Sequence, residues 1–106
     1  MQRATLDRLI EILQSARDRK RMYFRPIGPV AVEHWIWGLR IGCTFVGLEW
    51  SHEHRRPALE RRGLEYRMAA GETKQLRKRG LSPEAIVDEL LSIEIEMWAS
   101  HREQLP

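Results

Sequence analysis

The segment from about residue 30 to residue 50 most constrains the fold, because its apolar residues recur at helical spacing on two opposite sides. On a helical wheel of about 100° per residue, one apolar face contains Val32 and Ile36 and the other contains Trp37 and Ile41. A helix at the surface of a globular protein has one apolar stripe, so both of these faces need a cover. The sequence therefore predicts a central helix enclosed by its own domain or by another protein chain.

Helices are also expected on both sides of this segment. Residues 4–21 have one apolar stripe with the spacing of an amphipathic helix, and Ser82 and Pro83 have the residue types that begin a helix, here predicted over residues 83–102. Shorter helices are predicted over residues 58–62, 64–70 and 72–79. The expected fold is a compact all-α bundle of about five helices around the helix at 30–50, in a single domain spanning residues 1–106.

Composition limits the compartment and the class of protein. The chain has 106 residues, of which 42% are hydrophobic and 31% charged, as in folded globular proteins. Its single cysteine, Cys43, cannot form an internal disulfide bond. Charged residues interrupt the N-terminal region and also the least polar stretch, residues 30–50, so neither a secretion signal nor a membrane span is expected. These features predict a cytoplasmic protein that does not enter membranes.

Two glycines in the central segment predict close packing. Gly38 and Gly42 lie one helical turn apart, and small residues at this spacing let another backbone approach closely. Two interpretations stay open, a tight crossing inside the domain and the seam of a homodimer. The candidate interface residues are Trp35, Trp37, Gly38, Ile41, Gly42, Phe45 and Leu48.

Charge is distributed unevenly along the chain. Residues 51–80 contain nine Lys or Arg against four Asp or Glu, whereas residues 81–106 contain one against six. Two interpretations are open. The two regions neutralise each other inside the fold, or the basic region binds an acidic partner such as nucleic acid. The candidate residues for binding phosphate are Arg55, Arg56, Arg61, Arg62, Lys74, Arg77, Lys78 and Arg79.

The segment from Lys74 to Leu90 combines a basic helix, the turn Gly80-Leu81-Ser82 and inward-facing apolar residues. It resembles the first helix and turn of helix-turn-helix DNA-binding domains, which implies DNA binding. In that family a further helix reads the major groove. Here the helix after the turn is long and acidic, and an acidic helix is repelled by the phosphates that line the groove.

One acidic residue is predicted to lie among apolar neighbours. Glu94 falls in the middle of the apolar arc of the C-terminal helix, and His101 lies two turns further along nearly the same line. A buried carboxylate needs a partner, and Arg40 and His34 in the central segment are the candidates. The interpretations are a structural ion pair, or a polar pocket with Glu94, His101, Arg40 and Glu33 that binds a small ligand or supports acid–base chemistry.

Metal ligands are sparse. Glu49 and His52 are three residues apart, a spacing that places two ligands on one side of a helix, and His52 and His54 would share a side if extended. No further ligands complete either set, so no metal and no cofactor is predicted.

The sequence favours a non-enzymatic interaction or regulatory module that forms a homodimer. Nucleic-acid binding through residues 55–79 and a pocket around Glu94 are the alternatives.

Overall fold

The computed structural model describes residues 2–66 and 71–106, and these residues form six helices and no strand. The helices are α1 (Gln2–Asp18), α2 (Lys20–Tyr23), α3 (Pro29–Thr44), α4 (His52–Arg61), α5 (Glu72–Lys78) and α6 (Pro83–Glu103). The prediction of an all-α bundle is confirmed. The additional helix is α2, a short segment separated from α1 by a turn at Arg19.

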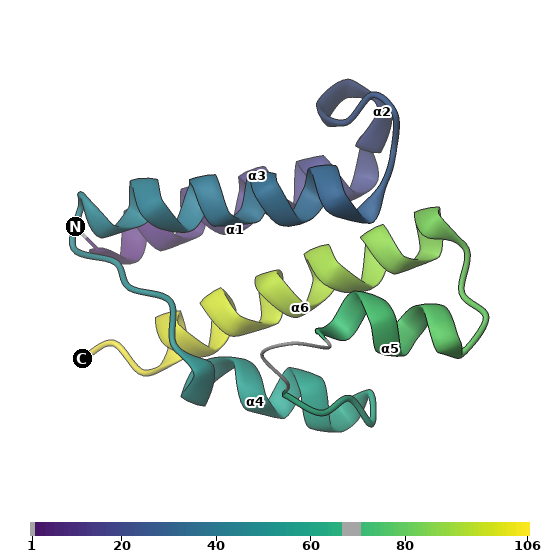
Figure 1. Ribbon diagram of the computed structural model, residues 1–106. Coiled ribbons are helices and arrows are strands. Elements are labelled where there is room, and N and C mark those ends of the chain that lie inside the picture. The colour runs from purple at the N-terminus through teal and green to yellow at the C-terminus, as the bar shows by residue number, and fades with distance from the viewer. Residues whose placement is uncertain (1, 67–70) are drawn as a thin grey trace.

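The helix at the centre of the bundle is α6. Figure 1 shows α1 and α3 on one side of α6 and α4 and α5 on the other, and all four pack against it. Nine residues of α6 are buried, and among them Leu91 and Ile93 are completely buried. The segment at 30–50, which was expected to be central, is an outer helix because only one of its two apolar faces is covered.

Helix α3 is shorter than predicted and ends at Thr44. Gly47 has a φ of 81°, the left-handed conformation that glycine adopts without strain. Around it, the Gly47 N–H donates to the Thr44 carbonyl at 3.1 Å and the Leu48 N–H donates to the Cys43 carbonyl at 3.0 Å. These bonds close the helix in the usual glycine-terminated way, so the chain turns away before residue 50.

Helix α4 begins earlier than predicted. The Ser51 hydroxyl accepts a hydrogen bond from the Glu53 N–H at 3.1 Å, which starts the helix at His52 rather than at residue 58. Pro57 therefore lies inside α4 and does not begin it. Of the helix predicted over 64–70, residues 64–66 are not helical and the rest lie outside the described residues.

The two C-terminal helices follow their predicted bounds closely. A glycine with a φ of 85°, Gly80, ends α5, and the Ser82 hydroxyl accepts from the Ala85 N–H at 3.2 Å to cap α6. Pro83 occupies the first turn of α6. Over the described part of the chain, no helix has both the length and the apolar character needed to cross a membrane.

Candidate functional site

A buried ion pair joins α3 to α6. Arg40 is 7% exposed and Glu94 is 1% exposed. The Arg40 Nε donates to Glu94 Oε2 at 2.8 Å, and the Arg40 Nη2 donates to Glu94 Oε1 at 2.5 Å. The contact that the sequence predicted between these two residues is thus present, in the two-pronged geometry that suits a guanidinium and a carboxylate.

Three tryptophans hold this pair in place. The Trp98 indole N–H donates to Glu94 Oε2 at 3.1 Å, and it comes from the next turn of α6. The Arg40 guanidinium carbon lies 5.2 Å from the ring centre of Trp37 and 4.4 Å from that of Trp50. These cation–π contacts and hydrogen bonds compensate in part for the removal of both charges from water.

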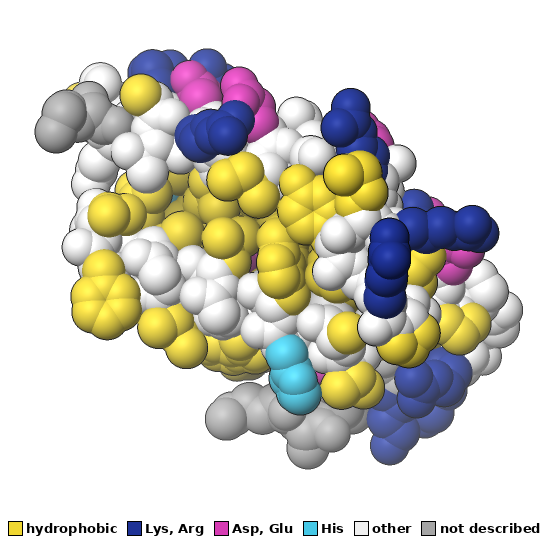
Figure 2. Space-filling view, turned by 90° about the horizontal axis from the view of Figure 1, so that it is seen from above, with side chains coloured by type: hydrophobic (Ala, Val, Ile, Leu, Met, Phe, Trp, Pro, Cys, Tyr) yellow, Lys and Arg dark blue, Asp and Glu magenta, His cyan; other side chains and the backbone are white. Residues whose placement is uncertain are grey.

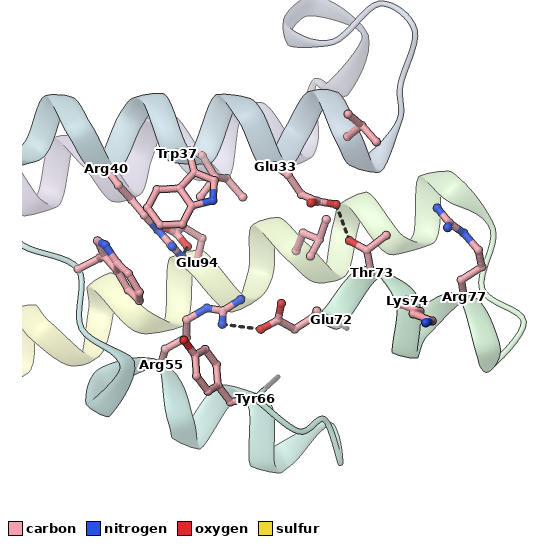
Figure 3. Close-up of a pocket in the computed structure, with 15 residues that line it drawn as sticks. Glu33, Trp37, Arg40, Arg55, Tyr66, Glu72, Thr73, Lys74, Arg77 and Glu94 are labelled. Atoms are coloured by element: carbon pink, nitrogen blue, oxygen red, sulfur yellow. Dashed lines mark hydrogen bonds and ion pairs between the residues drawn. The ribbon is translucent and has the colours of Figure 1, made fainter. Parts of the chain in front are cut away.

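A pocket of about 690 Å³ opens beside the pair, between α3, α4, α5 and α6 (Figure 3). Two further polar contacts cross its walls. The Arg55 Nη1 lies 2.5 Å from Glu72 Oε1, and the Thr73 hydroxyl donates to Glu33 Oε1 at 2.7 Å. The residues that line the pocket are Val30, Glu33, Ile36, Trp37, Arg40, Trp50, Arg55, Tyr66, Gly71, Glu72, Thr73, Lys74, Arg77, Leu90 and Glu94.

The carboxylate of Glu72 is held in its charged form. Burial alone would raise the pKa of Glu72, but the hydrogen bond and the positive charge of Arg55 outweigh it, so this pKa lies below the ordinary value. The charge of Arg40 adds to the effect. Two arginines and two glutamates therefore form adjacent, matched pairs in the pocket wall.

The third predicted member of the site, His101, lies elsewhere. Its ring stacks on His54 with centres 5.2 Å apart and on Trp98 with centres 5.8 Å apart, and it does not line the pocket. Burial, with a smaller effect from His54, lowers the pKa of His101 below its ordinary value. The structure brings Glu33, Arg40 and Glu94 to one pocket and places the histidine behind Trp98. His34, the other proposed partner of Glu94, is exposed.

The single thiol lies in the core. Cys43 is 8% exposed and faces the core. Burial, and then the nearby charge of Glu94, raise the pKa of the Cys43 thiol. A thiol with a raised pKa gives little thiolate at neutral pH, so this group is unsuited to covalent catalysis.

The second apolar face of α3 is open to solvent. Trp37 is 50% exposed, Ile41 is 58% exposed and Phe45, directly after the helix, is 86% exposed. A Cβ added to Gly38 or Gly42 would meet no atom within 4 Å, so the interpretation of a tight crossing inside the domain is wrong. We call the exposed residues along this side the outer face of α3: Val30, His34, Trp37, Gly38, Ile41, Gly42 and Phe45.

Figure 2 shows hydrophobic side chains gathered on the side of the molecule formed by α1 and α3, with charged side chains mostly around the edge. Two residues that the sequence assigned to the interface lie differently. Leu48 is fully buried because the turn at Gly47 redirects it into the core, and Trp35 is half-buried with its ring 5.4 Å from that of Phe24.

The basic residues of 55–79 are partly neutralised by the acidic C-terminal helix. Arg61 forms an ion pair with Glu96, and Arg62 pairs with both Glu96 and Glu89. Burial alone would raise the pKa of Glu96, but the hydrogen bonds from Arg62 and Arg61 lower it below the ordinary value. Arg55 pairs with Glu72, and Arg79 donates to the carbonyls of Arg62 and Gly63. The exposed remainder is Arg56, Lys74, Arg77 and Lys78.

The metal candidates do not converge. His52 and His54 lie in the first turn of α4, where two residues apart means different sides of the helix, and Glu49 precedes that helix. The His52 ring instead lies against the ring of Tyr66, with centres 4.1 Å apart. No group of three or more potential ligands comes together anywhere in residues 2–66 and 71–106.

Comparison with known proteins finds no matching family, no similar curated protein and no similar solved structure. The candidate site therefore stands on its own geometry. Arg40, Glu94 and Glu33 are conspicuous in the sequence because they are charges within largely apolar helices. Glu72 and Thr73 are not, because they lie in a polar helix with no such pattern.

Proposed function

We propose that this protein is a non-enzymatic interaction module that self-associates through the outer face of α3. The observation that carries the proposal is the combination of exposed bulky apolar side chains with two glycines, Gly38 and Gly42, beside which a Cβ would meet no atom within 4 Å. Unpartnered apolar faces of this kind mark interaction sites in folded proteins. Each glycine costs about 1 kcal/mol relative to alanine inside a helix, and among the described residues no atom packs into the space beside either glycine.

The shape of the outer face favours a second copy of the same chain. Trp37, Ile41 and Phe45 follow one another at intervals of four residues and form a ridge. Gly38 and Gly42 form a parallel groove directly beside this ridge. A two-fold rotation places the ridge of one α3 in the groove of the other and the reverse, which is the ridges-into-grooves packing of crossed helices.

Charge favours the same occupant. Of the titratable residues of α3, Arg40 and Cys43 are buried and Glu33 is half-buried against Thr73, so His34 alone is exposed. Two copies of the face therefore meet without strong like-charge repulsion. Because one helix pair covers less than the roughly 800 Å² per partner of a standard interface, we expect a reversible dimer with an affinity in the micromolar range.

Sedimentation velocity over a wide concentration range tests the proposal. We expect the native chain to shift from monomer to dimer as concentration rises, and Ile41→Glu to remain monomeric. Met22→Glu is the matched control, because Met22 is 72% exposed but lies on α2. A native chain that stays monomeric at about 1 mM, a concentration at which even a weak complex forms, contradicts the proposal.

The glycines give a second, independent readout. Gly38→Ala with Gly42→Ala introduces no clash within the chain, so it should raise the stability of the monomer by up to about 2 kcal/mol. The same change fills the groove and should weaken dimerisation at least tenfold. A variant that gains stability and dimerises like the native chain would remove the glycine seam from the interface.

A further inference from the structure

The pocket beside the Arg40–Glu94 pair has hydrogen-bond donors at its mouth that no group in residues 2–66 and 71–106 uses. Lys74 and Arg77 line the pocket on α5 and are exposed, and neither side chain has a partner among the described residues. Deeper in the wall, the Arg55 Nε is buried without a hydrogen-bond acceptor. An unsatisfied buried donor is unfavourable, and an acceptor that binds in the pocket can satisfy it.

The acceptors of the pocket are, in contrast, already engaged. Glu94 accepts two hydrogen bonds from Arg40. Glu72 forms an ion pair with Arg55, and Glu33 accepts a hydrogen bond from the Thr73 hydroxyl. Four cationic and three anionic side chains line the pocket, which leaves an excess of positive charge at the mouth. Figure 3 shows Lys74 and Arg77 on α5 at the end of the site away from Arg40.

The remaining wall is aromatic and aliphatic. The ring of Trp37 meets that of Trp50 edge-on, with centres 5.7 Å apart, and Ile36 and Leu90 add aliphatic surface. Arg40 fixes both rings through its guanidinium, so the wall is preorganised. The volume of about 690 Å³ falls in the range of small-molecule sites.

We propose that this pocket binds a small organic oxyanion with a flat apolar body. The carboxylate or phosphate group lies between Lys74 and Arg77, where a lysine and an arginine supply charge-assisted hydrogen bonds. The apolar body extends from there along the aliphatic wall of Ile36 and Leu90 toward Trp37 and Trp50. The site shares Trp37 with the outer face of α3, but its anion-binding residues are on α5, so variants of α5 test it without altering the dimer proposed above.

Titration followed by NMR tests this inference on the full chain. The probes are phenyl phosphate and benzoate, with inorganic phosphate to remove the apolar body and benzylamine to reverse the charge. We expect saturable shifts of the Trp50 indole N–H with one or both aromatic anions, since Trp50 lies off the outer face of α3. We expect at least tenfold weaker binding of inorganic phosphate and of benzylamine. The stronger aromatic anion identifies the oxyanion class.

Variants separate the site from general charge attraction. Lys74→Ala with Arg77→Ala should weaken binding of the aromatic anion at least tenfold, while Lys78→Ala, an exposed cation of the same helix outside the pocket, should leave it within about twofold. Equal effects of the two variants, equal binding of benzylamine, or no saturation by either aromatic anion overturns the proposal. If the Lys74→Ala/Arg77→Ala variant still forms a dimer, self-association does not depend on anion binding.

Discussion

Arg40 and Glu94 depend on each other because each is charged and almost completely removed from solvent. Removal of one partner leaves an uncompensated charge in the core, which costs about 3–5 kcal/mol, whereas removal of both replaces a pair whose net contribution is small. The pair therefore contributes more to the specificity of the α3–α6 contact than to its strength.

We expect Glu94→Gln to lower the free energy of unfolding by about 3–5 kcal/mol, because the amide still accepts from Trp98 but no longer balances the charge of Arg40. The double variant Arg40→Met/Glu94→Leu should lose only about 1–2 kcal/mol, chiefly for the Trp98 N–H left without an acceptor. Urea unfolding of both variants measures the difference. If the double variant is as unstable as the single variant, the charge is not the cause.

At the scale of residues, the sequence predicted the Arg40–Glu94 contact and placed Glu33 in the same pocket, but it did not predict the other pocket residues. A carboxylate within an apolar helical arc must find a buried cation, and few cations lie in apolar surroundings. Arg55 belongs to a run of basic residues in which no member is marked by apolar neighbours. Its partner, Glu72, begins a short polar helix. Which charges of polar segments meet depends on how α4 and α5 pack, and no local pattern encodes that.

Between elements, α4 and α6 are joined by stacked imidazoles as well as by ion pairs. His54 contacts the Ser100 hydroxyl at 3.2 Å and stacks on His101, whose Nδ1 is buried without a partner. The folded pKa of His101 lies below its ordinary value of 6.5. The unfolded chain therefore binds a proton first as the pH falls, and the stability contributed by neutral His101 is complete above about pH 6.5 and is lost as the pH falls through the folded pKa.

We expect the native chain to lose more stability between pH 7.5 and pH 5.5 than His101→Gln, which has no group to protonate there. Thermal unfolding at several pH values measures the two slopes. His34→Gln is the control, since His34 is exposed on α3, and it should keep the native slope. If His101→Gln lost stability with falling pH as steeply as the native chain, neutral His101 would not be the source of the pH dependence.

Helix positions were largely predictable, but the helix at the centre was not. Both the segment at 30–50 and the last helix have apolar residues over more than one face. The choice of centre depends on which of them is long enough to contact four other helices, and α6 has 21 residues against 16 in α3. The exposed face of α3 that results is the surface on which the self-association proposal depends.

At the scale of the whole molecule, the unevenly distributed charges of the sequence largely form ion pairs with one another within the fold. Carboxylates of the acidic α6 form ion pairs with Arg61 and Arg62, at the end of α4, and with Lys20 of α2. Arg102, near the end of α6, forms an ion pair with Asp7. This arrangement also limits the resemblance to helix-turn-helix domains. Helix α6 buries nine residues at the centre of the bundle and cannot enter a DNA groove while the fold is intact.

We therefore expect only weak, sequence-independent binding of duplex DNA, with a dissociation constant no tighter than about 1 µM at physiological salt. Glu89→Gln/Glu96→Gln should bind more tightly and with a steeper salt dependence, because it frees Arg61 and Arg62 for phosphates. Fluorescence anisotropy with a labelled duplex at several salt concentrations measures both. Glu84→Gln is the control, since Glu84 is exposed in the first turn of α6 and forms no ion pair within the part of the chain that the structure describes. Tight binding by the native chain with preference for one sequence would show that a basic surface other than the paired arginines recognises DNA.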